Sequence, residues 1–119
     1  MRLQTALPSF YAELDGAMLD HEEADVRQQL ASLEITGRCE CDQPDCATFH
    51  VAPSRMLNAV EQNVIGVRYG RSIPLDSLPG LVVVDVDNFG RVTTIEVLDR
   101  PDVSTELTRL RVPGGRTRS

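Results

Sequence analysis

The stretch LVVVDVDNFGRVTTIEVLD, residues 81–99, constrains the fold more than any other part of the sequence. Two runs rich in β-branched residues flank a short polar turn, which is the pattern of a β-hairpin. Asp87 suits the first position of a type I turn, and Gly90 supplies the left-handed residue that closes a three-residue loop. The sequence therefore predicts an antiparallel strand pair whose core residues are mainly valines.

Two carboxylates of the first strand, Asp85 and Asp87, lie two residues apart and so on one face. Paired carboxylates can perform acid–base chemistry or hold a hard cation. The predicted register instead pairs them across the hairpin with Thr93 and Arg91. We therefore interpret both carboxylates as structural.

The segments around the hairpin carry further signals. Apolar residues recur at steps of three and four over residues 3–18, which predicts a helix that begins near Pro8. A second helix is expected from Asp20 or His21 to about residue 33, with acidic side chains in its first turn. The remaining elements are expected to be strands at 34–39, 47–52 and 64–70, a loop at 72–80 and a short helix at 101–110. The pattern at 53–63 is ambiguous and allows a short helix.

This order of elements predicts an α+β fold, in which an antiparallel sheet is joined by two N-terminal helices and a short C-terminal helix. The length of 119 residues suits one domain. We expect a single α+β domain over residues 1–112, with a cysteine loop at 39–46. Residues 113–119 are polar and are predicted to form a disordered tail.

The charge distribution excludes some classes of partner. The formal net charge is −6, and the first sixty residues carry ten acidic and four basic side chains. Binding to nucleic acid needs clustered cationic side chains, so no nucleic-acid partner is expected. The sequence has no apolar run long enough for a membrane span and no signal pattern at its N-terminus. We therefore expect no membrane association and a cytoplasmic location, where thiols stay reduced.

The segment CECDQPDCATFH, residues 39–50, holds every cysteine of the chain. An odd number of cysteines, two of them one residue apart, argues against a disulfide framework. Thiolates are among the preferred ligands of zinc, and structural zinc sites have four ligands. Three cysteines on a polar turn would supply most of such a site. The sequence thus predicts a structural zinc ion bound by Cys39, Cys41 and Cys46.

The fourth ligand is open at this point. His50 is the first candidate, four residues after Cys46, but an extended strand would separate their Cα atoms by about 13 Å. His50 can therefore ligate only if the chain bends. The alternatives are His21, Asp42, Asp45 or a water molecule. A further alternative treats the cysteines as plain core residues or as redox groups; the acidic residues around them disfavour a reactive thiolate without metal.

The hairpin also resembles a known family. The run VVVDVDNFGRVTTIEVLDRPDV, residues 82–103, is similar to the signature of the YuzE-like small bacterial family of unknown function. The matching positions are Asp85, Asp87, Gly90, Arg91, Ile95, Glu96, Leu98 and Asp99. The stretch GRCECDQPDCATFHVAP also resembles a cysteine-containing segment of uncharacterised bacterial proteins that often ends in Thr-Phe-Tyr, where this chain has His50. The resemblance implies an α+β fold and a bacterial protein without known activity.

These observations favour a small non-enzymatic domain that binds a protein partner, with a zinc ion bracing its cysteine loop. No phosphate-binding loop, nucleophile elbow or metalloprotease motif is present, so no enzyme activity is expected. A homodimer is left open. One alternative is an acidic immunity protein or antitoxin that neutralises a basic partner through the acidic residues Glu13, Asp15, Asp20, Glu22, Glu23 and Asp25. Another is a zinc enzyme with three cysteines and a water on the metal, with Glu40 as its base.

Overall fold

The structure is a computed structural model that describes residues 1–41, 43, 45–53 and 69–114. Its elements, in chain order, are α1 (Leu3–Ala6), α2 (Pro8–Met18), α3 (Ala24–Gln29), the 3₁₀ helix η1 (Leu30–Ser32), β1 (Leu33–Arg38), β2 (Phe49–Pro53), β3 (Tyr69–Pro74), β4 (Leu81–Asp87), β5 (Val92–Leu98) and α5 (Pro101–Arg109).

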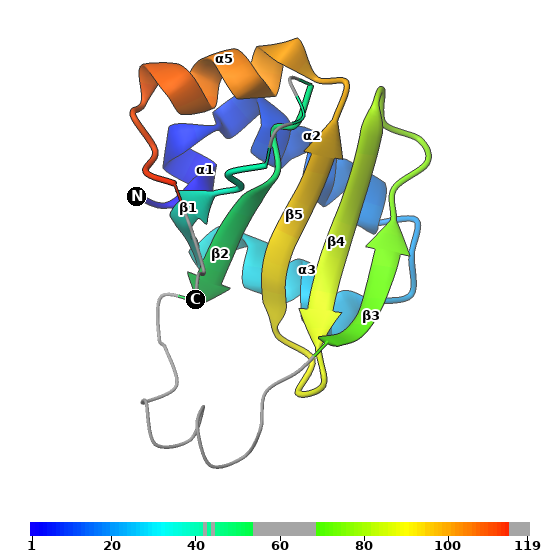
Figure 1. The fold of residues 1–119 in the computed structure, drawn as a ribbon. Coiled ribbons are helices and arrows are strands. Elements are labelled where there is room, and N and C mark those ends of the chain that lie inside the picture. The colour runs from blue at the N-terminus through cyan, green and yellow to red at the C-terminus, as the bar shows by residue number, and fades with distance from the viewer. Residues whose placement is uncertain (42, 44, 54–68, 115–119) are drawn as a thin grey trace, which may run out of the picture.

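The five strands form one antiparallel sheet in the order β1-β2-β5-β4-β3. Helices α1, α2 and α3 lie on one face of this sheet, and α5 lies across one of its ends (Figure 1). The predicted α+β fold with N-terminal helices and a short C-terminal helix is therefore confirmed. None of the helices in the described part of the chain is long and apolar enough to cross a membrane.

The core forms between the sheet and the helices because the strands alternate inward and outward side chains. Phe49 of β2 is fully buried and meets Phe10 of α2 edge to face, with ring centroids 6.1 Å apart. On β4 the buried positions alternate, which gives the valine-rich inner face that the sequence indicates. The inward residues of the hairpin are Val82, Val84, Val86, Val92, Ile95 and Val97.

The turn of the hairpin follows the prediction. Gly90 has a φ of 79°, and Oδ1 of Asp87 accepts hydrogen bonds from the backbone N–H groups of Phe89 and Arg91 at 2.8 and 2.9 Å. The Arg91 guanidinium donates to Oδ2 of Asp87 at 3.0 Å. Asp87 is buried, and its carboxylate holds the turn together. This agrees with the structural role predicted for Asp87.

The register beyond the turn was predicted wrongly. A bulge shifts the pairing of β4 with β5, so that Asp85 faces Thr94 and not Thr93. Thr93 is the extra residue of this bulge, and it turns Ile95 and Val97 toward the core. The sequence pattern does not reveal a bulge because a β-branched residue fits either face of the strand.

Several boundaries also differ from the prediction. Helix α3 begins at Ala24 and not at Asp20 or His21, and Glu23 occupies the cap position without a side-chain capping bond. Strand β3 continues to Pro74, where a loop was expected, because residues 71–74 pair with β4. The predicted helix at 53–63 and most of the predicted strand at 64–70 lie outside the described residues.

Arg100 connects three parts of the structure from a nearly buried position, with 5% of its side chain exposed. Its guanidinium donates to Glu13 of α2 at 3.0 Å, to Asp102 of α5 at 2.9 and 3.0 Å, and to the carbonyl of Pro79 at 3.2 Å. It also lies 5.3 Å from the ring centroid of Phe10. Hydrogen bonds to Asp102 raise the pKa of Arg100 despite its burial.

The outer edge of β1 is paired with both ends of the chain. The N–H of Ile35 donates to the carbonyl of Met1, and the N–H of Arg38 donates to the carbonyl of Pro113, both at 2.8 Å. Gly114 forms a parallel bridge with Arg38. The first two residues of the predicted tail thus pair with the sheet, and residues 115–119 lie outside the described part.

Candidate metal centre

The cysteines lie on an extension of the β1–β2 hairpin. The N–H of Cys39 donates to the carbonyl of Thr48 at 2.9 Å, in the same register that pairs Arg38 with Phe49. Cys41 lies two residues beyond Cys39, past the end of β1, and Cys46 lies two residues before Thr48. The N–H of Cys46 donates to the carbonyl of Gln43 at 3.2 Å.

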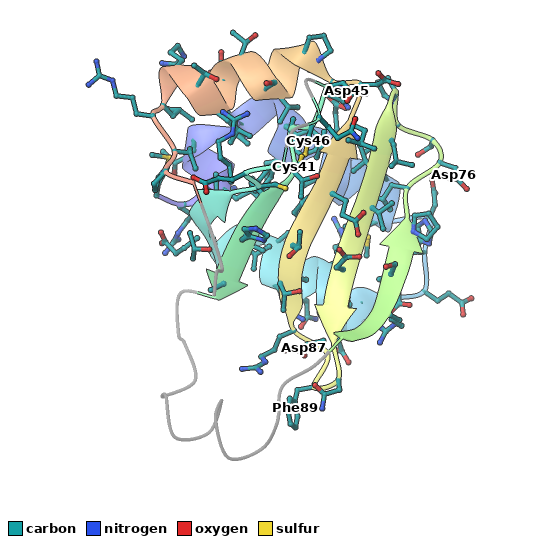
Figure 2. The ribbon with its side chains drawn as sticks, viewed as in Figure 1. Cys41, Asp45, Cys46, Asp76, Asp87 and Phe89 are labelled. Carbon is teal, nitrogen blue, oxygen red and sulfur yellow. The ribbon has the colours of Figure 1, made fainter. Side chains whose placement is uncertain are left out.

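This arrangement brings the three sulfur atoms together. The Sγ atoms of Cys39, Cys41 and Cys46 all lie within 4.8 Å of one another. Thiolates bound to a tetrahedral zinc at 2.3 Å are about 3.8 Å apart, so an approach of about 1 Å would complete the geometry. The cysteine triad, defined here as these three residues, could therefore hold a metal ion. Figure 2 shows Cys41 and Cys46 beside the end of β5.

The sheet fixes the position of the triad. The N–H of Ala47 donates to the carbonyl of Val97 at 2.8 Å, and the N–H of Val97 donates to Oγ1 of Thr48 at 2.9 Å. Cys46 itself forms a bridge with Leu98 of β5. The returning limb of the cysteine loop is thus hydrogen-bonded to a central strand, which holds Cys46 in place without a metal.

The thiols differ in acidity. Burial raises the pKa of Cys39 to about 11, and a hydrogen bond with Cys41 adds to this. Burial also raises the pKa of Cys46, but hydrogen bonds with the backbone and side chain of Thr48 and with the other two thiols outweigh it and lower the pKa. The sequence indicated raised pKa values for all three thiols. It missed the effect of Thr48, which acts only because the loop folds against β5.

His50 lies elsewhere on the same strand. The pairs Cys46–Leu98, Phe49–Ile95 and His50–Thr94 share one register, so the chain runs straight from Cys46 to His50. Nδ1 of His50 is 3.2 Å from Oγ1 of Thr94. The bend that ligation by His50 requires is not present, and the described group of close ligand atoms comprises the three cysteines. Ligation by His50 stays a prediction.

The other candidate ligands take separate positions. His21 lies in the connection between α2 and α3, and Asp45 is exposed, with its carbonyl accepting from the N–H of Asp99 at 3.2 Å. Asp42 lies outside the described residues. Glu40 lies between Cys39 and Cys41, and its carboxylate lies against Gly114, where a Cβ would overlap it. Glu40 therefore faces the C-terminal segment and not the triad.

A row of polar residues crosses the sheet face that carries no described helix. Ser72, Asp85, Thr94 and His50 are cross-strand partners in turn from β3 to β2. Oγ of Ser72 donates to Oδ1 of Asp85 at 2.6 Å. A hydrogen bond with Asp85, helped by burial and by the charge of Asp85, raises the pKa of Glu96 to about 7. The sequence missed this pair of carboxyls because the bulge at Thr93 sets their register.

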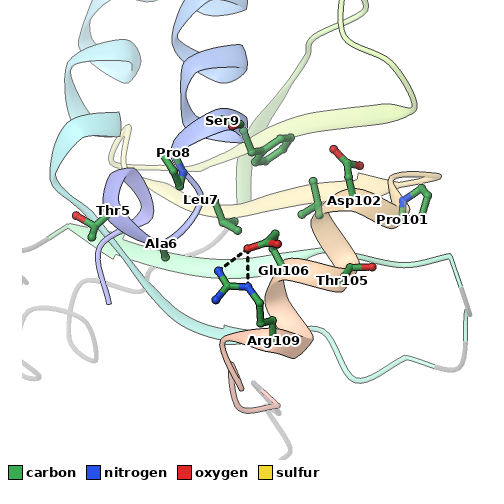
Figure 3. Close-up of a pocket in the computed structure, with 12 residues that line it drawn as sticks. Thr5, Ala6, Leu7, Pro8, Ser9, Pro101, Asp102, Thr105, Glu106 and Arg109 are labelled. Atoms are coloured by element: carbon green, nitrogen blue, oxygen red, sulfur yellow. Dashed lines mark hydrogen bonds and ion pairs between the residues drawn. The ribbon is translucent and has the colours of Figure 1, made fainter.

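A groove of about 810 Å³ lies between α5 and the start of α2 (Figure 3). Its apolar wall includes Leu7 and Phe10. Its charged lining residues are already paired: Glu106 accepts from Arg109, and Asp102 accepts from Arg100. This groove therefore offers a shaped apolar surface without a free charged group among its lining residues.

Fold and site together define an α+β domain with a cysteine triad in the loop between β1 and β2. No protein-family model, curated protein or solved structure matches this chain. The resemblance of residues 82–103 to the YuzE-like family stays a prediction.

Proposed function

We propose that the cysteine triad binds one zinc ion, which braces the tip of the β1–β2 hairpin in a non-enzymatic binding domain. The observation that supports this most is the approach of three Sγ atoms to within 4.8 Å on a short turn. Thiolates select zinc or other soft metals over magnesium and calcium. A metal would connect residues on both limbs of the hairpin and so stabilise a polar loop.

The fourth ligand of this zinc is proposed to be a water molecule or another small ligand. His50 would have to leave its contact with Thr94 and bend a strand that pairs on both sides. Cys41 is exposed, so solvent reaches the triad. Three thiolates and one small ligand would complete the four-coordinate geometry that zinc prefers.

The test is the metal content of the full-length chain, purified without an affinity tag. We expect about one zinc per chain by elemental analysis. The variants Cys39→Ser, Cys41→Ser and Cys46→Ser should each lose the metal and unfold at lower temperature. Thr36→Ser is the matched control, because Thr36 is exposed on β1 outside the triad. Wild-type protein free of metal, with three titratable thiols and unchanged stability in the variants, would refute the proposal.

We also propose that the partner of this domain is a basic protein. Three residues of the predicted acidic run already form ion pairs: Glu13 with Arg100, Asp15 with Arg27, and Glu23 with Arg71. The others, including Glu22 and Asp25, are exposed. Glu22 and Asp25 line a groove of about 640 Å³ that also holds the exposed Phe89. Arg71 and Arg91 also line this groove, and each is paired with an acidic residue. The exposed acidic positions beside the Phe89 ring therefore suit a segment that carries both basic and apolar residues.

A synthetic peptide that alternates arginine and leucine serves as the probe for this surface, with a glutamate–leucine peptide as control. We expect backbone NMR shifts around Phe89 and Asp25 with the basic peptide only, and weaker binding as salt increases. The variant Asp25→Arg should weaken binding, whereas Asp76→Arg, at an exposed site outside this groove, should not. Equal shifts with both peptides would contradict the proposal.

A further inference from the structure

The cysteine triad has a second property besides metal binding. Its three thiols are free in the structure, Cys41 is exposed, and Cys39 and Cys46 are partly exposed. Exposed thiols next to a second thiol are the common targets of reversible oxidation, because the second thiol resolves the first oxidation product as a disulfide. The question is which pair of the three can form that bond.

The hairpin register answers it. A disulfide needs Cα atoms about 4.4–6.8 Å apart. The Sγ atoms of Cys41 and Cys46 lie within 4.8 Å of each other, and Cys41 lies beyond the end of β1 on the exposed part of the loop. Cys39 and Cys46 are diagonal neighbours, about 7–8 Å apart. Cys39 and Cys41 are separated by about 6.6 Å along one strand, at the upper limit of the range.

We propose that Cys41 and Cys46 form a reversible disulfide when the protein meets a hydroperoxide, and that this oxidation releases the metal. The metal release rests on the proposed zinc site, whereas the disulfide does not. The new bond would join residues 41 and 46 and leave Cys39 as a thiol. A single remaining thiolate cannot retain a zinc ion that needs three.

The chemistry balances with a peroxide as the only oxidant. The Cys41 thiolate attacks one peroxide oxygen, the O–O bond breaks, and Cys41 becomes a sulfenic acid while hydroxide leaves. The Cys46 thiolate then attacks the Cys41 sulfur, the S–O bond breaks, and a second hydroxide leaves. Two protons from the thiols convert both hydroxides to water. In total two thiols lose two electrons, and one hydrogen peroxide becomes two water molecules.

The position of the triad gives this oxidation a structural consequence. Cys39 follows Arg38, whose N–H binds Pro113 and whose guanidinium donates to Thr108 at 3.1 Å and to Ser104 at 3.4 Å. After oxidation the two limbs would be joined at Cys41 and Cys46, and the Cys39 side chain would lose its metal contact while its N–H keeps the hydrogen bond to Thr48. The C-terminal segment, which pairs with β1 at Arg38, is therefore the part expected to respond.

The first arm of the test uses reduced, chelator-treated, full-length protein and hydrogen peroxide. We expect titratable thiols to fall from three to one and the mass to decrease by two hydrogen atoms. A protease that cuts before aspartate separates Cys41 from Cys46, at Asp42 and Asp45, so a disulfide between them leaves two peptides joined. Cys39→Ser should still form the disulfide, whereas Cys41→Ser should lose it, and dithiothreitol should restore every thiol in the wild type.

The second arm uses zinc-loaded protein with a chromophoric chelator present. Zinc should appear in step with the loss of two thiols, one ion per disulfide. Disulfide formation in a protein that binds no zinc would refute the proposed metal site and the proposed metal release. It would still support the proposed disulfide. Zinc binding with three thiols intact after peroxide, oxygen addition without a disulfide, or an equally rapid disulfide in Cys41→Ser would overturn the inference.

Discussion

Replacing Glu96 by glutamine is expected to change how stability depends on pH. The Glu96 carboxyl hydrogen-bonds with Asp85, and its pKa is raised from 4.5 to about 7. The folded protein thus holds this proton more tightly than the unfolded chain. Its contribution to stability is present below pH 4.5 and is lost as pH rises from 4.5 through 7. Above pH 7 both carboxyls are charged and repel each other.

The magnitude follows from the shift. One pKa unit corresponds to 1.36 kcal/mol, so the full shift of 2.5 units would correspond to about 3 kcal/mol. Glu96 is partly exposed, and solvent screening reduces this to on the order of 1 kcal/mol. Glutamine keeps a hydrogen-bond donor for Asp85 and cannot ionise. Glu96→Gln should therefore match the wild type at pH 5 and exceed its stability at pH 8.

Urea unfolding at several pH values between 5 and 8 measures this difference. The control is Glu106→Gln, which removes one negative charge from a surface position paired with Arg109. It should follow the wild-type pH profile, whereas Asp85→Asn should reproduce the effect of Glu96→Gln. A Glu96→Gln profile parallel to that of the wild type would refute the shared proton.

Three further predictions concern the scaffold and the site. Arg100→Met should reduce the free energy of unfolding in urea by about 3 kcal/mol, because Glu13 would lose its buried partner. Arg109→Met, at an exposed ion pair, should leave the free energy of unfolding nearly unchanged. Gly90→Ala should lower the melting temperature, because the φ of 79° at this position costs alanine about 1 kcal/mol. Gly16→Ala should raise the melting temperature, because Gly16 lies inside α2 with open space around it and alanine favours helix. His50→Ala should keep the wild-type metal content by elemental analysis, and loss of the metal would show that His50 is a ligand after all.

The sequence predicted those features that depend on local chemistry. The hairpin turn followed from Asp87 and Gly90, because a carboxylate acceptor and a left-handed residue are needed at fixed positions in such a turn. Helix α2 begins at Pro8 as expected, because proline suits the first turn of a helix. The density of cysteines in residues 39–46 likewise indicated a group of possible metal ligands, which the structure brings close together.

The sequence could not predict features that depend on pairing between distant segments. The bulge at Thr93 changes the register, and only this register brings Asp85 and Glu96 together. The acidic residues between Glu13 and Asp25 were predicted to form an acidic surface for a basic partner. In the structure, Arg27, Arg71 and Arg100 pair with half of them across gaps of 12 to 87 residues.

By itself, the sequence determined the α+β class, the hairpin and the residues of a thiol-rich turn, since these follow from periodicity and from residue type. Tertiary structure decided how the site is built. The pairing of residues 46–48 with β5 holds one side of the triad, lowers the pKa of Cys46 and keeps His50 on a straight strand. These features depend on backbone hydrogen bonds between segments about fifty residues apart, and such bonds leave no pattern in the local sequence.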